Sequence, residues 1–123
     1  MTNLSIKNST AEMVTAIEEG LISKKGIDPL VMDFSKMQNI AFERFIICTG
    51  SSGTHANALA DAVIDTVISQ CKDKPWHVEG RENAEWILLD YGNIVVHIFQ
   101  PEKREFYKLE ALWADADIRQ VTE

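Results

Sequence analysis

The sequence predicts a single α/β domain in which helices flank a mixed β-sheet of about five strands. Long segments with apolar residues at helical spacing alternate with short apolar runs that end at glycine, proline or asparagine. The chain has 123 residues, enough to bury one core, so we expect one domain over residues 1–123. Its polar ends, residues 1–8 and 115–123, are expected to be flexible tails.

The first helix is predicted to begin after Ser9. Ser9 and Glu12 have the spacing of a capping box, apolar residues follow at helical intervals, and Gly26 ends the pattern. Two strands are predicted next, from the apolar runs at Pro29–Phe34 and Phe42–Gly50.

The most regular helical pattern runs from Ala56 to Cys71, and Ser51, Ser52 or Thr54 can cap its start. The preceding turn, with the sequence TGSS, can also hold a phosphate on the amides of the helix N-terminus. We favour a turn followed by a helix cap, because the chain lacks the glycine-rich patterns of nucleotide-binding loops.

A β-hairpin is predicted over Glu85–Gln100. Gly92–Asn93 is a two-residue turn signal between two apolar runs. With this turn, Asp90 lies opposite Val95, and Asp90 and His97 become diagonal neighbours on one face, roughly 7–8 Å apart. Both faces of the hairpin carry apolar residues, so we expect it to be covered on both sides.

Asp90 and His97 are predicted to form a structural polar pair, because a buried histidine needs a hydrogen-bond partner. The alternative is a small hydrolytic or nucleotidyltransferase-like enzyme. In it, Cys48 or a serine of the Gly50–Ser52 turn is the nucleophile, His97 the base and Asp90 the group that orients the base. The turn lacks the nucleophile-elbow motif, which favours the structural interpretation.

A short strand at Pro75–Gly80 and a last helix over Pro101–Trp113 complete the predicted elements. Phe106, Leu109 and Trp113 form one apolar stripe on this helix, which predicts that all three are core residues.

Trp86, at the start of a strand, is the aromatic residue best placed for partner binding, because strand ends meet the rim of a sheet. Tyr107 lies off the apolar stripe of the last helix, beside Arg104 and Glu110. Tyr107 and Arg104 are expected to flank Trp86, because this helix begins just after Phe99, the residue predicted to lie opposite Trp86. Tryptophan, tyrosine and arginine are the residues that dominate binding hot spots.

The overall charge and composition exclude several classes of function. The formal net charge is -7, with 12 Lys and Arg against 19 Asp and Glu, which suits a basic protein partner better than nucleic acid. The two cysteines form no metal-binding motif, and Asp61 and Asp65 fall on the polar face of a helix, so no metal or cofactor is expected. No apolar run or leader pattern indicates a membrane or export, so we expect a cytoplasmic protein.

Three stretches within roughly Ile27–Trp113 carry ordered motifs: FIICTGSSGTHANALAD, VEGRENAEWILLDYGNIVVHIF and REFYKLEALW. With these motifs the chain resembles the Iojap, or ribosomal silencing factor, family. It departs from the family pattern at Asn93, where aspartate is common in the hairpin turn. It also departs at Glu43 and Arg44, where aspartate and an aromatic residue are common.

The resemblance implies a fold similar to that of nucleotidyltransferases without their catalysis, so no enzymatic activity is expected. It implies binding to the large ribosomal subunit through ribosomal protein L-fourteen, on the face where the small subunit docks. Such binding blocks subunit joining and represses translation under nutrient limitation, as in stationary phase. The resemblance also implies a homodimer when the protein is free, and it points to Trp86 as a contact. The candidate partner-binding residues are Trp86, Asp90, Arg104, Tyr107 and Glu110.

Overall fold

The computed structural model describes residues 9–122 and contains one six-stranded mixed sheet with helices on both faces. The elements in chain order are α1 (Thr10–Ser23), β1 (Ile27–Asp33), β2 (Arg44–Thr49), α2 (Gly53–Cys71), β3 (His77–Glu79), β4 (Trp86–Asp90), β5 (Ile94–Phe99), α3 (Pro101–Tyr107), α4 (Leu109–Leu112) and β6 (Asp117–Gln120). The strand order is β3-β4-β5-β2-β1-β6. The β2–β5 pair is parallel and the other pairs are antiparallel. The predicted α/β class with a mixed sheet is confirmed.

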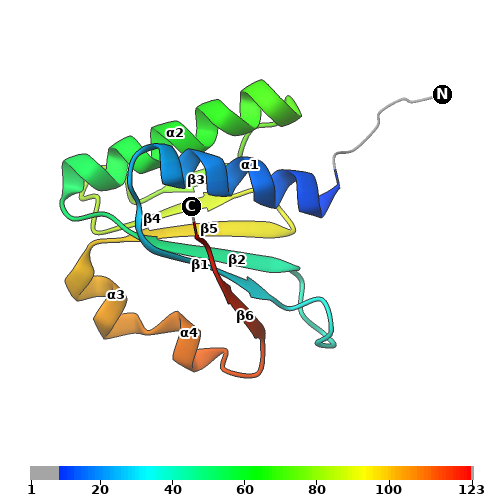
Figure 1. Ribbon diagram of the computed structural model, residues 1–123. Helices are drawn as coiled ribbons and strands as arrows, with labels where there is room; N and C mark the ends of the chain where they lie inside the picture. Colours follow the sequence, from blue (N-terminus) through cyan, green and yellow to red (C-terminus); the bar gives the residue numbers. More distant parts are fainter. Residues whose placement is uncertain (1–8, 123) are drawn as a thin grey trace.

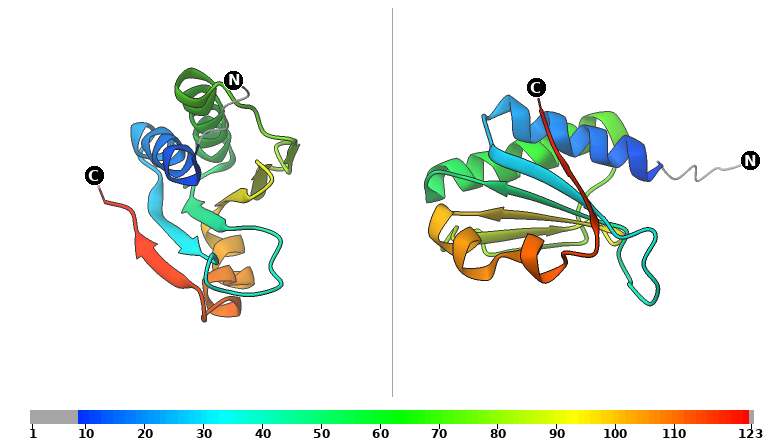
Figure 2. Two further views of the ribbon diagram at one scale, coloured as in Figure 1. Left: turned by 90° about the vertical axis from the view of Figure 1, so that its right-hand side faces the viewer. Right: turned by 60° about the horizontal axis from the view of Figure 1, so that its bottom comes forward.

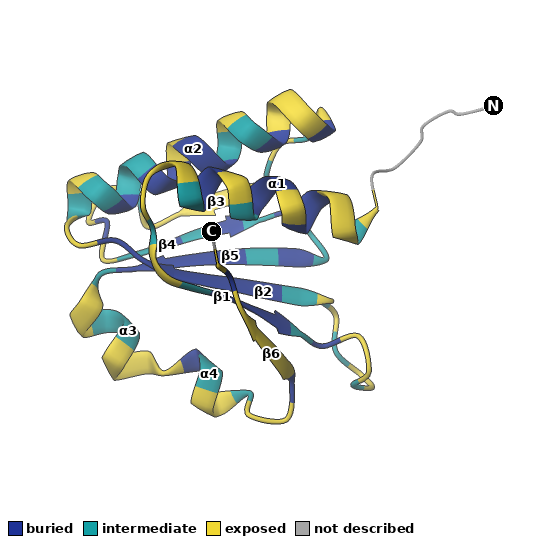
Figure 3. Ribbon diagram, viewed as in Figure 1, coloured by how far each residue is buried: buried dark blue, intermediate teal, exposed yellow. Residues whose placement is uncertain are grey.

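The sheet separates two apolar layers (Figure 1). Helices α1 and α2 lie side by side on one face, and the short helices α3 and α4 lie on the other (Figure 2). Because strand side chains alternate, Ile46 packs under the long helices while its neighbours Phe45 and Ile47 pack toward α4. The central strands β2 and β5 are buried along most of their length, whereas the outer sides of all four helices are exposed (Figure 3).

The two long helices begin as the sequence predicts. The Ser9 hydroxyl accepts a hydrogen bond from the Glu12 amide, and Glu12 accepts one from the Ser9 amide, which completes the capping box. Ser52 caps α2 through the amide of His55. Gly20 lets the helices approach closely, because an added Cβ there would lie 2.9 Å from the Ala62 carbonyl oxygen.

The hairpin register is confirmed. Asp90 lies opposite Val95 and Trp86 lies opposite Phe99. The Tyr91 amide donates to the Ile94 carbonyl across the turn, at 2.8 Å. Trp86, Asp90 and His97 therefore share the face that points toward α3 and α4.

Two expectations for the C-terminal part were wrong. Residues 115–123 were expected to be a tail, but Asp117–Gln120 forms β6 on the free edge of β1. All four side chains of β6 are exposed, so the strand lacks the alternation by which a sequence reveals a half-buried strand. The predicted helix 101–113 is broken at Lys108, whose φ of 45° is left-handed, giving α3 and α4. The expectation for residues 1–8 lies outside the described residues.

Within residues 9–122, none of the helices is long and apolar enough to cross a membrane.

Candidate partner-binding surface

Trp86 lies half-buried at the rim of the sheet, between a strand and a helix. Its indole stacks on Phe99, the residue opposite it on β5, with ring centroids 4.9 Å apart. The ring of Tyr107, the last residue of α3, meets the indole at a tilt of 45°, with ring centroids 4.6 Å apart. Tyr107 thus flanks Trp86 as the sequence suggests. Because the ring centroids of Phe99 and Tyr107 are themselves 6.3 Å apart, the three rings form one cluster, with part of the indole surface free.

Phe106 extends this feature into solvent. Its side chain is 76% exposed, that of Tyr107 is 43% exposed, and the two rings meet edge to face at 5.0 Å. The prediction that Phe106 belongs to the core was wrong, because the break at Lys108 changes the helical phase. Leu109 remains in the core, but Phe106, one turn earlier, faces outward. We call Trp86, Phe106 and Tyr107 the aromatic surface.

A hollow of about 170 Å³ lies beside Trp86, lined by Gly80, Asn83, Glu85, Trp86, Lys103 and Tyr107. Gly80 forms its wall with a φ of +86°, and an added Cβ would lie 2.0 Å from the Trp86 carbonyl oxygen. Only glycine fits this position, because both the backbone angle and the space exclude a side chain. The loop before β4 therefore packs directly against the backbone of Trp86.

The predicted Asp90–His97 pair is not formed, although the two residues share a face. Asp90 Oδ1 accepts a hydrogen bond from the Gly92 amide at 2.8 Å, within its own turn. His97 lies opposite Leu88, so Trp86 and Asp90 are equally near to it as diagonal neighbours. Its Nδ1 accepts a hydrogen bond from the Trp86 indole Nε1–H at 3.1 Å.

His97 is buried in an aromatic environment that keeps it neutral. It is 4% exposed, and its ring meets that of Phe45 at 4.5 Å. Burial lowers the pKa of His97 from 6.5 to about 4, because desolvation disfavours the charged imidazolium.

This shifted pKa predicts a loss of stability in acid. The unfolded chain binds the proton near pH 6.5 and the folded chain only near pH 4, so the unfolded state takes up more protons between them. The free energy of unfolding should therefore fall as the pH drops through this window, by on the order of 3 kcal/mol from His97 alone. Urea melts of the native chain and His97→Phe at about pH 7 and pH 4.5 isolate this contribution. Equal acid losses in both proteins would contradict it.

Arg104 lies elsewhere than we expected. It was predicted to flank Trp86, but its Nη1 donates instead to the Asp28 carbonyl at 2.8 Å and the Thr49 hydroxyl at 2.9 Å. Its Nε pairs with Glu110 Oε2 at 3.4 Å, and its side chain is only 13% exposed. Arg104 therefore links α3 to the start of β1 and the end of β2, and through Glu110 it also links α3 to α4.

The match to known proteins agrees with this architecture. A family model described as "Ribosomal silencing factor during starvation" matches residues 7–123. The chain belongs to the ribosomal silencing factor family. A relative from Chromobacterium violaceum, named Ribosomal silencing factor RsfS, is 40% identical over 100 residues, which cover 77% of this chain and 76% of the relative. The resemblance drawn from the sequence motifs is confirmed.

A solved structure and a mouse protein with a mitochondrial name are also similar to this chain. The X-ray structure of a protein from Chromobacterium violaceum has a TM-score of 0.80 and 36% sequence identity, covering 87% of this chain and 88% of that one. A mouse protein named "Mitochondrial assembly of ribosomal large subunit protein 1" is 34% identical over 71 residues. That match covers 56% of this chain and 31% of the mouse protein.

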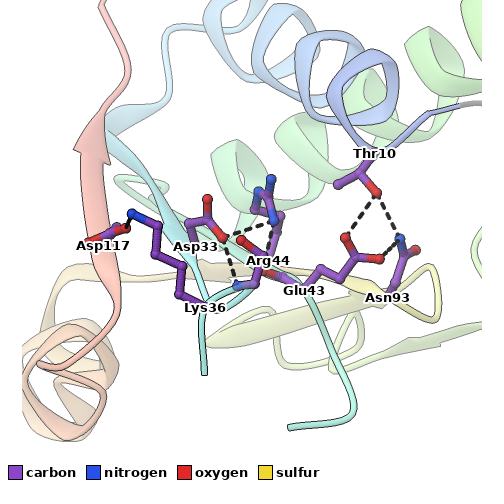
Figure 4. A network of polar contacts seen from close by, with 8 residues as sticks. Thr10, Asp33, Lys36, Glu43, Arg44, Asn93 and Asp117 are labelled. Atoms are coloured by element: carbon purple, nitrogen blue, oxygen red, sulfur yellow. Dashed lines mark hydrogen bonds and ion pairs between the residues drawn. The ribbon is translucent and has the colours of Figure 1, made fainter. Parts of the chain in front are cut away.

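Glu43, Arg44 and Asn93, where the sequence is expected to depart from the silencing factor pattern, lie close together (Figure 4). The Asn93 amide donates to Glu43 Oε2 and to the Thr10 hydroxyl, both at 3.1 Å. Arg44, next to Glu43, pairs with Asp33 at 3.0 Å. The Asn93 side-chain amide is a donor and the Glu43 carboxylate is an acceptor, so these two residues are compatible with each other.

Ribosomal silencing factors are regulatory, ribosome-associated proteins, and the structure does not assemble the alternative hydrolytic site. The Ser51 amide donates to His55 Nδ1 at 2.8 Å, and His55 Nε2 lies 2.8 Å from the Lys24 carbonyl, so this imidazole fixes the turn. Burial raises the pKa of the Cys48 thiol to about 12, which keeps it protonated and unreactive.

The acidic residues considered as metal ligands have structural surroundings. Asp61 pairs with Arg81 at 2.7 Å. Across the part of the chain that the structure describes, no group of three or more His, Cys, Asp and Glu side chains is placed to hold a metal ion.

Proposed function

We propose that this protein binds the large ribosomal subunit through ribosomal protein L-fourteen and blocks joining of the small subunit. Bound in this way, it represses translation in the cytoplasm when nutrients are limited. Membership in the ribosomal silencing factor family supports the proposal, as does the mouse relative whose name refers to the ribosomal large subunit. The observation that carries it is the half-buried Trp86, in contact with the rings of Phe99 and Tyr107 at the sheet rim.

The aromatic surface has the physical properties of a protein-binding hot spot. Trp86 is already ordered by its two neighbouring rings, so binding restricts few additional rotamers. Exposed Phe106 and Tyr107 add apolar area next to it. Asp90, half-buried on the same sheet face, remains in the proposed contact set.

Charge favours the same class of partner. The chain carries a net charge of -7, which attracts a basic ribosomal protein and accelerates its encounter. Arg104 and Glu110 pair with each other inside the domain and hold α3 and α4 in place. Trp86 and Tyr107 contact the partner directly. Binding then acts by steric exclusion and needs no chemical step.

We also propose that the free protein forms a weak homodimer whose interface overlaps or adjoins the aromatic surface. Exposed Phe106 and Tyr107 support this, because covering an exposed apolar patch with a second copy of the chain lowers the free energy. Formation of the ribosomal complex would then compete with the dimer.

Co-sedimentation with purified ribosomal subunits tests the proposed function. The protein should pellet with large subunits and not with small subunits, and binding should weaken as salt is raised. Purified ribosomal protein L-fourteen, added in excess, should compete with the large subunit. Equal binding to both subunits, or none to the large one, would contradict the proposal.

A further inference from the structure

The hydrogen bond between Trp86 and His97 joins the exposed rim to the interior. The indole Nε1–H donates to His97 Nδ1 at 3.1 Å, on the sheet face toward α3 and α4. His97 cannot move to follow the indole, because its ring is 4% exposed and packed against Phe45 and Phe99. The acceptor is therefore fixed, and the tryptophan is the partner that adjusts.

This bond determines the tautomer of His97. Since Nδ1 accepts, the ring proton is on Nε2; the other tautomer would point two N–H groups at each other. His97 Nε2 is buried and has no hydrogen-bond partner among the described residues. A buried donor without an acceptor is unfavourable, so a chain with an apolar ring of similar shape at position 97 would be at least as stable as the native one. What histidine adds at this position is an acceptor for Trp86.

Stacking alone does not determine which edge of the indole faces inward. Phe99 stacks on the indole and Tyr107 lies against it at a tilt of 45°, and such ring contacts do not require the indole N–H to point in one direction. Only an acceptor on one side distinguishes the two orientations, because a flipped indole moves its N–H away from His97.

We propose that His97 is a positioning residue for the partner-binding surface. By accepting the indole hydrogen bond it selects one orientation of Trp86, and so raises affinity for the partner without touching it. The affinity part rests on the proposed function, since it requires Trp86 to be a ribosomal contact. The orientation part concerns this chain alone.

His97→Phe tests both parts. Phenylalanine keeps the buried ring and removes the acceptor. The protein should fold with a melting temperature at pH 7 no lower than that of the native chain. In ¹⁵N spectra, the Trp86 indole signal should shift and exchange with solvent faster, while the signals of Trp76 and Trp113 stay in place. Affinity for isolated large subunits should fall about five- to tenfold, the effect of about one hydrogen bond.

Two further variants separate positioning from packing. His97→Asn returns an acceptor near the Nδ1 position and should recover part of the lost affinity, even though it fills less space. Trp86→Phe keeps the ring and removes the donor, so adding His97→Phe to it should cause no further loss. Independent losses in the double variant would show that His97 acts by another route.

The outcomes distinguish the two proposals. If the native chain does not bind large subunits, the proposed function fails, and the indole spectra still decide the orientation part. If the native chain binds and His97→Phe binds equally well with an unchanged indole signal, the positioning role is refuted. A His97→Phe chain that does not fold would also refute it, because the histidine would then be required for stability.

Discussion

Replacing Trp86 with alanine is expected to weaken binding to the large ribosomal subunit by about 2 kcal/mol or more, which is roughly thirtyfold. The indole is the largest side chain at the centre of the aromatic surface, and it is already ordered by Phe99 and Tyr107. The fold should survive, because truncation at an open rim leaves no closed cavity. Titration against isolated ribosomal protein L-fourteen measures the loss, and circular dichroism melting checks the fold.

Trp76 provides a matched control. It is 72% exposed and packs over Gly92, at the opposite end of β4 from Trp86. Trp76→Ala therefore removes a more exposed indole that lies outside the aromatic surface, and it should bind within about twofold of the native chain. Equal losses in both variants would mean that general apolar contact, rather than this surface, drives binding. A Trp86→Ala chain that melts far earlier than the native one would make Trp86 a core residue instead.

Replacing Arg104 with methionine is expected to cost about 2–4 kcal/mol of unfolding free energy. Methionine keeps much of the apolar stem, so the loss comes from the guanidinium. That group bonds the Asp28 carbonyl and the Thr49 hydroxyl, and without it Glu110 is left as a half-buried carboxylate lacking its partner. The thermal midpoint should fall by roughly 10 °C or more.

Lys36 offers the comparison for Arg104. It pairs with Asp117 at 3.4 Å, but the two side chains are 85% and 66% exposed. Lys36→Met should therefore change stability by no more than about 0.5 kcal/mol. If Arg104→Met is as mild as Lys36→Met, the bonds beneath α3 and α4 contribute little, and the rigid placement of Tyr107 must have another origin.

The elements with strong local signals were predictable. The capping box at Ser9, the apolar stripe from Ala56 to Cys71 and the Gly92–Asn93 turn each specify their structure through neighbouring residues. Strand β6 was not predictable, because its exposed side chains show no alternation of apolar and polar residues. Its stability comes from pairing with β1, which is distant in the sequence. The break at Lys108 likewise depends on a single left-handed residue of a type that usually continues a helix.

The candidate site was predictable in its residues but not in its connections. Trp86 and Tyr107 were correctly placed together, because their positions follow from a strand start and the helix after the hairpin. The partner of His97 was predicted wrongly, since the register makes Asp90 and Trp86 equal neighbours. Asp90 is unavailable to His97, because its carboxylate accepts a hydrogen bond from the Gly92 amide in the turn, so Trp86 is the partner of His97. Arg104 was misplaced because its bonds to β1 and β2 connect residues far apart in sequence.

Assembly of ribosomes from purified subunits is the most direct test of the central claim. Large subunits are first incubated with this protein, small subunits are then added, and the joined particles are resolved on a sucrose gradient. We predict that the joined fraction falls as the protein concentration rises, and that Trp86→Ala needs roughly thirtyfold more protein for the same effect while Trp76→Ala acts like the native chain. Unchanged joining at protein concentrations that saturate the large subunit would contradict the claim that this protein silences ribosomes by preventing the two subunits from joining.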